Sequence, residues 1–394
     1  MISGNDPGIR AGQARGAGCP VSASVDAFAP DAIAQLAQAL GPGPFAQVLL
    51  FASPGADLHH LATQAATQFP QAIICGCTTA GEITAQGYAE GQLVGFALPR
   101  TGFEVEALVI EGLDRLDARA LIADLLRLRQ SLARRAFERR HEFAILLVDG
   151  LSGQEDALVA ALSGGLGPVP IIGGSAGDGA SFGRTLIHAR GQVYENAAVL
   201  SLVRSDCQVR LFSLDHLRPT GARMVVTRAD PARRSVARIN DEPAAAEYAR
   251  LLGLQTDQLS SFVFAAHPVL VRAGGRHHVR AIQRVGQGDQ LEFFAAIDEG
   301  LVLTIAEPDD IVAHLDRELA QLATTGAPSA ILGFDCIFRR IEAEGRQRQH
   351  ELSAILARHR VTGFSTYGEQ IGAMHVNQTM TGVAFYPPDD RGDE

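Results

Sequence analysis

Three short stretches of the chain combine a small hydroxyl residue, a glycine and an acidic residue directly after an apolar run. They are residues 76–82, 174–179 and 365–369. The backbone N–H groups of a glycine turn beside a hydroxyl suit a phosphate cradle or an oxyanion hole. Small residues at such turns also permit positive φ angles and let neighbouring strands approach closely, which is the simpler interpretation.

Ser175 is the candidate nucleophile in these stretches. Residues 173–177 give it the Gly-x-Ser-x-Gly spacing of a hydrolase elbow. No convincing histidine and acid partners follow in a hydrolase order. All 34 basic residues are arginine, which excludes a P-loop lysine, a Schiff-base lysine and a lysine general base. We therefore expect a protein that is not an enzyme, with a hydrolase as the third option.

Composition and charge restrict the partners of this protein. A net charge of −10 disfavours binding to the phosphate backbone of a nucleic acid. The five cysteines are odd in number and scattered, which indicates reduced thiols rather than a disulfide framework. No apolar run approaches the roughly 18 to 20 residues that span a bilayer, and the start of the chain lacks a signal peptide. The sequence predicts a cytoplasmic protein without membrane insertion.

Apolar runs alternate with stretches of helical period along the chain. Short buried strands are expected at residues 48–51, 72–75, 143–148, 169–172, 330–334 and 361–364, and helices at 58–69, 154–162 and 347–359. Continuous apolar strands alternating with helices favour an α/β fold with mainly parallel sheets covered by helices. A unit of strand, helix, strand, glycine turn and strand is predicted three times, and residues 225–291 leave room for a fourth, diverged copy.

The length of 394 residues indicates two domains. We expect a flexible leader over residues 1–24, an α/β domain over 25–217, a related α/β domain over 218–386, and a polar tail over 387–394. The seam is placed where Pro219 and Gly221 follow the last strand of the second unit.

Several separate motifs, in order, resemble those of FIST-domain sensory proteins. They are residues 75–82 and 173–179 in the first half, and 224–227, 239–244, 334–340, 363–369 and 375–379 in the second. Phe338 and Gln370 depart from the family pattern. The resemblance implies a bacterial intracellular sensor with FIST N and FIST C halves. It also implies a signalling partner acting in trans, either a histidine kinase or a cyclic-di-GMP enzyme, and permits a homo-oligomer.

Similarity to nitric-oxide-sensing members of that family implies haem b as the cofactor. His375 is then the expected metal ligand, because it follows the third glycine turn at the strand ends, where open α/β sheets bind ligands. The alternative is that His375 holds its loop by bonding Asn377 or Glu369. His188 and His267 are the reserve ligands.

Arg339 and Arg340 are expected to pair with the two haem propionates, because a guanidinium meets a carboxylate through two parallel bonds. The competing role is structural, since one of them could bridge to Glu369 and tie the third unit together.

The alternative hypothesis is a sensory module for a small organic ligand such as an amino acid. The expected ligand-binding residues come from the glycine turns and the loop after the third: Thr79, Glu82, Ser175, Asp178, Tyr367, Gly368, Glu369 and Asn377. Both ligand hypotheses require the glycine turns to meet at one edge of the fold and to frame a common cavity, with a hollow beside His375.

Overall fold

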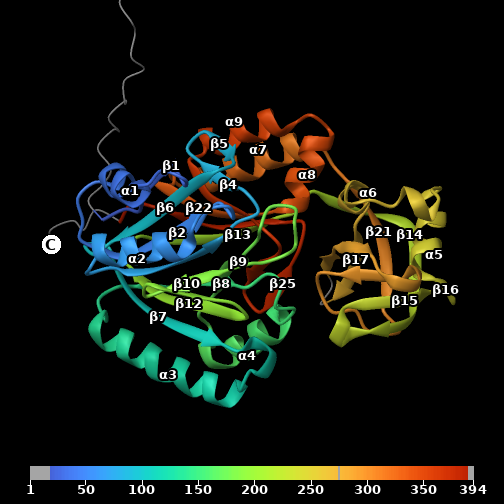
Figure 1. The fold of residues 1–394 in the computed structure, drawn as a ribbon, viewed down its shortest axis with the longest axis horizontal. Helices are drawn as coiled ribbons and strands as arrows, with labels where there is room; N and C mark the ends of the chain where they lie inside the picture. The colour runs from blue at the N-terminus through green and yellow to red at the C-terminus, as the bar shows by residue number, and fades with distance from the viewer. Residues whose placement is uncertain (1–17, 274–275, 389–394) are drawn as a thin grey trace, which may run out of the picture.

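Three six-stranded sheets with the same strand order make up most of the computed structural model, which describes residues 18–273 and 276–388 (Figure 1). The first sheet has the order β1 (Val21–Asp26), β6 (Gln92–Pro99), β2 (Phe45–Ala52), β3 (Ile73–Thr78), β10 (Ile187–Ala189), β11 (Gln192–Tyr194). The second has β7 (Phe103–Glu111), β12 (Ala197–Ser205), β8 (His141–Val148), β9 (Ile171–Ser175), β24 (Glu369–Ile371), β25 (Met374–Val376). The third has β13 (Val209–Leu214), β26 (Met380–Phe385), β22 (Ala330–Cys336), β23 (Val361–Thr366), β4 (Glu82–Thr84), β5 (Gly87–Ala89).

The last two strands of each sheet form a hairpin. In the sequence, this hairpin directly follows a strand of a different sheet. The β4–β5 hairpin follows β3 but pairs with β23, through Ile83 opposite Gly363. The β10–β11 hairpin follows β9 but pairs with β3, and the β24–β25 hairpin follows β23 but pairs with β9. The chain therefore crosses from one sheet to another at each of the three glycine turns.

The prediction of mainly parallel sheets is wrong. In the described part of the chain only β2–β3, β8–β9 and β22–β23 are parallel, one pair in each of the three sheets. Each strand–helix–strand segment supplies one parallel pair, and the other strands join it in antiparallel register. The three sheets share one strand order.

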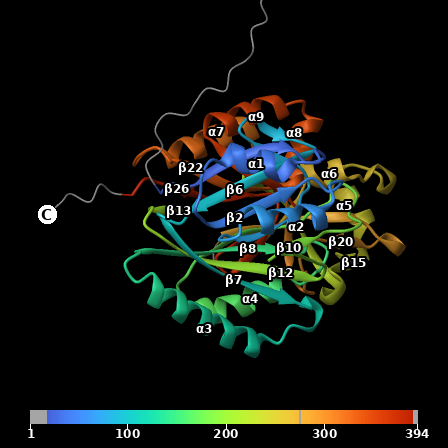
Figure 2. The ribbon, with the colours of Figure 1, turned by 60° about the vertical axis from the view of Figure 1, so that its left-hand side comes forward.

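Helices cover the outer face of each sheet, and the inner faces share one core. The first sheet carries α1 (Ala32–Leu40) and α2 (Leu58–Gln68), the second α3 (Ala118–Arg135) and α4 (Glu155–Leu166), and the third α7 (Ile311–Leu322), α8 (Ile337–Gly345) and α9 (Gln349–Arg358). In the shared core, Phe51 lies 4.6 Å from Phe364 and Phe143 lies 5.9 Å from Phe385, measured between ring centroids. Figure 2 shows this layering from the side.

An antiparallel domain is inserted into the third unit between β13 and α7, and we call residues 217–308 the insert. Its strands are β14 (Leu217–Asp230), β15 (Ser235–Ile239), β16 (Glu242–Pro243), β17 (Val269–Ala273), β18 (Arg276–Arg280), β19 (Ile282–Val285), β20 (Leu291–Phe293) and β21 (Val302–Pro308). Its helices are α5 (Ala244–Leu252) and α6 (Ser261–Ala266), with 3-10 turns η2 (Pro231–Arg233), η3 (Thr256–Gln258) and η4 (Gln287–Asp289); η1 (Leu113–Arg115) precedes α3. The suggested fourth copy of the unit in 225–291 is wrong, because none of the strand pairs formed by the insert's described residues is parallel.

The insert stands to one side of the three-sheet body and is tethered by two adjacent linkers (Figure 1). The N–H of Asp309 donates to the carbonyl of His216 at 2.7 Å, so the outgoing and returning chains run side by side. The expected leader lies outside the described residues up to residue 17, and its last residues lie in β1. Among the described residues, no helix is long and apolar enough to cross a membrane.

Candidate functional site

The three glycine turns meet at one place, as both ligand hypotheses required, but His375 does not line the hollow found beside the first two turns. The N–H of Ala80 donates to the Ser365 carbonyl at 2.8 Å, which joins the first turn to the third. The N–H of Gly177 donates to Thr78 at 3.1 Å, and the N–H of Ser175 donates to Gly368 at 2.7 Å. The turns are adjacent because each is a point where the chain passes from one sheet into another.

Close backbone approach explains the glycine in the second turn. A Cβ placed on Gly177 would lie 2.7 Å from the Cβ of Ala80 and 2.8 Å from its N atom. No real side chain fits at that distance, so a larger residue here would push the first and second turns apart.

The two turn glutamates are buried and hold their own turns. Glu82 accepts from the Thr79 hydroxyl and, at 3.0 Å, from the N–H of Gln92. Glu369 accepts from the Thr366 hydroxyl and, at 2.7 Å, from the hydroxyl of Thr379.

Burial raises the pKa of both glutamates, and that of Glu369 reaches about 8 because desolvation outweighs its hydrogen bonds. With this pKa, Glu369 is mostly protonated at neutral pH. In this conformation the carboxyl group therefore stabilises its own turn rather than carrying a charge.

Asp178 and Tyr367 join the second and third turns. The Tyr367 hydroxyl donates to Asp178, and the other carboxylate oxygen of Asp178 accepts from the N–H groups of Gly183 and Arg184 at 2.8 and 2.7 Å. The Tyr367 ring stacks on Phe182 with 4.5 Å between centroids. Burial and the hydrogen bond to Asp178 raise the pKa of Tyr367, so its hydroxyl keeps the proton it donates.

The insert packs against the turns through aromatic rings. Phe294 of the insert lies 5.8 Å from Phe182 and 5.4 Å from Phe338, measured between ring centroids. Ala265 and Ala281 of the insert belong to the same buried cluster. The departure from the family pattern at Phe338 therefore lies at the contact between insert and body.

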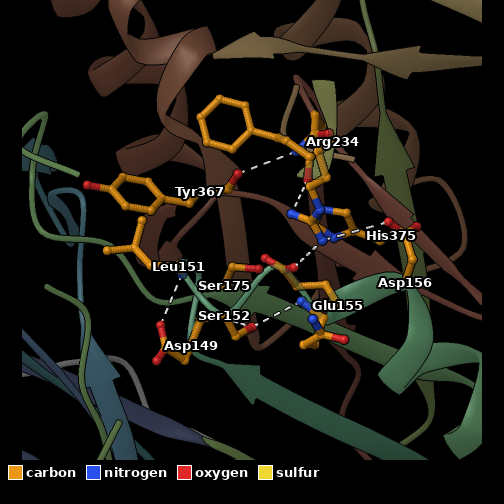
Figure 3. A network of polar contacts seen from close by, with 12 residues as sticks. Asp149, Leu151, Ser152, Glu155, Asp156, Ser175, Arg234, Tyr367 and His375 are labelled. Carbon is orange, nitrogen blue, oxygen red and sulfur yellow. Dashed lines mark hydrogen bonds and ion pairs between the residues drawn. The ribbon is translucent and has the colours of Figure 1, made fainter. Parts of the chain in front are cut away.

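A polar network lies beside these rings, where α4 begins (Figure 3). Arg234 of the insert reaches into the body, and its Nη2 lies 2.6 Å from Glu155 and 3.9 Å from Asp156. Glu155 is only 2% exposed. Arg234 also donates to the carbonyl of Phe294, so one side chain fixes the insert to the first turn of α4.

His375 lies at the same place, on β25 opposite Gln370, and Figure 3 shows it close to Arg234. The Gln370 Nε2 donates to Ser175 Oγ at 2.9 Å and to His375 Nδ1 at 3.3 Å. Burial lowers the pKa of His375, so the ring is neutral and Nε2 carries its proton.

Three buried polar atoms at this place have no hydrogen-bond partner among the described residues. They are His375 Nε2, Gln370 Oε1 and Asn377 Oδ1. Buried polar atoms without a partner are costly and uncommon, and they often mark a position that a bound group completes. His375 also lies over Gly368, where an added Cβ would be 2.3 Å from its Cε1.

The paired arginines have other partners than those predicted. Arg339 is fully buried and donates to Asp335 at 2.7 Å and to His216 at 2.9 Å. Arg340 pairs with Glu90 at 2.6 Å and Glu344 at 2.9 Å. Neither forms the predicted bridge to Glu369, so that alternative is wrong.

The remaining candidate histidines are dispersed. His188 lies in β10 of the first sheet, where burial lowers its pKa to about 4. His267 follows α6 in the insert, and its carbonyl accepts from Tyr248 at 2.5 Å. His375 lies in the second sheet. The sequence-predicted histidines do not form one cluster.

The residues as arranged do not fit a haem held by His375 with Arg339 and Arg340 on its propionates. The His375 ring is 3% exposed and is covered by Gly368, and both arginines are already paired with carboxylates. Within the described ranges no group of three or more His, Cys, Asp or Glu side chains is placed to hold a metal ion.

A surface hollow of about 520 Å³ lies beside the first two turns, at the start of α2. Thr78, Asp178 and Arg184 line it, together with residues 54–59. Asp178 and Arg184 each have protein partners there, since Arg184 pairs with Glu195 at 2.5 Å.

Arg234, Glu155 and Arg280 were missed by the sequence analysis. Glu155 and Asp156 stand at the start of a predicted helix, which was a signal for the acidic half of the cluster. The arginines come from a region with no recognised motif, so nothing in their spacing marked them.

Comparison with known families accounts for almost all of the folded chain. Residues 46–242 match the FIST N domain and residues 244–372 match the FIST C domain. The boundary between the two matches falls inside the insert, after β16 begins. No curated protein matches the chain. FIST domains are sensory ligand-binding modules of signalling proteins, and the chain belongs to the FIST family.

Proposed function

We propose that the protein senses a small organic ligand that carries one positive and one negative charge, such as an amino acid. The binding place is the region where Arg234, Glu155 and His375 meet, between the insert, the first turn of α4 and the β24–β25 hairpin. We call it the insert–body site. We do not propose a hydrolase role, because the Ser175 hydroxyl accepts a hydrogen bond from Gln370.

The observation that carries the proposal is the set of buried partnerless atoms on His375, Gln370 and Asn377 beside a charge-balanced cluster. The arginines of that cluster are Arg234 and Arg280, and its acids are Glu155 and Asp156; all four act electrostatically on His375. Two cations and two anions leave no net charge, which suits a ligand that is itself neutral overall but has a cationic and an anionic end.

Signal output is proposed to run through a separate bacterial protein in the cytoplasm, either a histidine kinase or a cyclic-di-GMP enzyme. The insert is the part that a ligand would reposition, because only two adjacent linkers connect it to the body. Its contacts with the body include the Arg234 ion pair, the aromatic rings and the hydrogen bonds of Gln378 to α6. A homo-oligomer is compatible with this arrangement.

Haem b for nitric oxide sensing is the second candidate, supported by the partnerless Nε2 of His375. His375 would hold the iron only if its ring were released from under Gly368, and haem would then supply the gas-binding chemistry. Arg339 and Arg340 already pair with protein carboxylates, so the haem propionates would lack their predicted partners.

Thermal denaturation of the full chain with each common amino acid tests the proposal. A ligand at 100 times its Kd stabilises the folded state by about 2.7 kcal/mol, so a binding amino acid raises the melting temperature measurably. The N-acetylated form of the same compound lacks the cationic end and should give no rise.

Haem is titrated in parallel. A Soret band that shifts with nitric oxide and is lost in His375→Ala, with no response to any amino acid, would overturn the proposal in favour of haem.

A further inference from the structure

The β17–β18 hairpin of the insert lies against β25, the strand that carries His375. Arg280 is the last residue of β18 and pairs in register with Val269. This hairpin therefore brings an arginine to the insert–body site.

Arg280 differs from Arg234 in having no ionic partner among the residues that the structure describes. Its only hydrogen bond in the described structure runs from Nη1 to the carbonyl of its neighbour Val279, at 3.1 Å. Arg280 forms none of the ion pairs within 4.0 Å found among the described residues, whereas Arg234 pairs with Glu155 at 2.6 Å. Burial lowers the pKa of Arg280, and Asp156 opposes this effect only from a distance. A partly buried guanidinium without a carboxylate is in an unfavourable setting.

His375 supplies a further hydrogen-bond donor, one that has no acceptor in the described part of the chain. Its Nε2–H is buried without a partner, because Nδ1 already accepts from Gln370. Arg280 lies near enough to act electrostatically on the ring. The Nε2–H of His375 thus lacks an acceptor and the guanidinium of Arg280 lacks a carboxylate, and the strands that carry them, β25 and β18, are in contact.

We propose that Arg280 and the Nε2–H of His375 form a subsite for the carboxylate group of a small ligand. This rests on the proposed function and specifies which end of the ligand binds where. A guanidinium binds a carboxylate through two parallel bonds, and an imidazole N–H supplies a third. The cationic end then faces the side of Glu155 and Asp156.

A carboxylate fits this subsite better than a phosphate. One unpaired guanidinium balances one negative charge, and Glu155 and Asp156 nearby repel a dianion. Arg280 is partly exposed and His375 is almost fully buried, so the carboxylate would meet the guanidinium first.

Acetate is the probe and acetamide its uncharged control, both added to the full chain at constant ionic strength. Relaxation of their methyl NMR signals reports binding. Saturable acetate binding without acetamide binding is the expected result. Arg280→Gln should weaken acetate binding at least tenfold, and Arg272→Gln, an exposed arginine on the same hairpin, should leave it unchanged.

Absence of saturable acetate binding, or equal binding to Arg280→Gln and wild type, overturns the subsite. Should Arg280→Gln fail to fold, Arg280→Lys is the second variant. It keeps the positive charge but cannot donate two parallel hydrogen bonds, so its acetate binding should be several-fold weaker than that of wild type. Amino acid binding that is unaffected by Arg280→Gln would leave the proposed function intact and reject only the carboxylate subsite. Acetate binding without amino acid binding would do the reverse.

Discussion

Replacing Arg234 by methionine should destabilise the contact between the insert and the body. The change leaves Glu155 buried without its cation, at a place where the two charged groups were 2.6 Å apart. Breaking one side of a buried ion pair costs about 3 to 5 kcal/mol. The Arg234 side chain is 13% exposed, so we expect a loss of stability at the lower end of that range, about 3 kcal/mol.

A double-mutant cycle with Glu155→Gln separates the ion pair from other losses. Glu155→Gln alone should also destabilise the folded protein, because Arg234 then lacks its carboxylate partner. Arg234→Met with Glu155→Gln leaves no buried charge unpaired and should recover about 2 kcal/mol relative to the sum of the single changes. The remaining loss is the hydrogen bond from Arg234 to Phe294.

Urea denaturation followed by circular dichroism gives the free energies, and hydrogen exchange locates the effect. Faster exchange is expected at the start of α4 and around Phe294, with little change in the core of the first sheet. Arg233→Met is the matched control, because that neighbouring side chain is 84% exposed and its removal should change stability by less than about 0.5 kcal/mol. The reasoning is refuted if Arg234→Met behaves like Arg233→Met, or if the two single changes are additive.

Three further predictions test the turns and the buried network. Glu369 binds its proton more tightly in the folded than in the unfolded state, so wild-type stability should fall as pH rises from about 4.5 to about 8, and Glu369→Gln should flatten that slope in urea titrations at several pH values. Gly368→Ala should lower stability by about 1 to 3 kcal/mol through collision with the neighbouring imidazole, whereas Gly221→Ala, in open space, should change the melting temperature little. Tyr88→Phe removes the hydroxyl that bonds the buried Asp335 and should cost about 2 kcal/mol, and a denaturation midpoint equal to wild type would contradict this network.

The sequence located the parallel strand pair of each sheet, the helices α2, α4 and α9 and the meeting of the glycine turns, but it misjudged the direction of the other strands. Continuous apolar runs were interpreted as parallel strands because such strands are usually buried on both faces. Here the antiparallel strands β6, β12 and β26 are buried on both faces too, since helices cover one side and the shared core the other. Burial on two faces arises from the layering and does not depend on strand direction.

The candidate site was only partly predictable for a related reason. His375, Gln370 and Ser175 lie in or beside recognised motifs, but Arg234 and Glu155 are 79 residues apart and meet only through the docking of the insert. The helix α8 (Ile337–Gly345) was not expected, because its apolar residues run straight on from β22 without a turn signal. Long-range docking of this kind leaves no mark in local spacing.

The exchange of hairpins among the sheets has a consequence for biosynthesis. The first sheet has all its strands once residue 194 has left the ribosome, but the second waits for residues 369–376 and the third for β26 at Met380–Phe385. Until then β9 presents an open row of backbone donors and acceptors, the kind of edge that recruits foreign strands. Nonsense mutations late in the gene should therefore produce aggregated protein rather than a shortened but soluble sensor, and newly made chains should depend on chaperones until their last segment arrives.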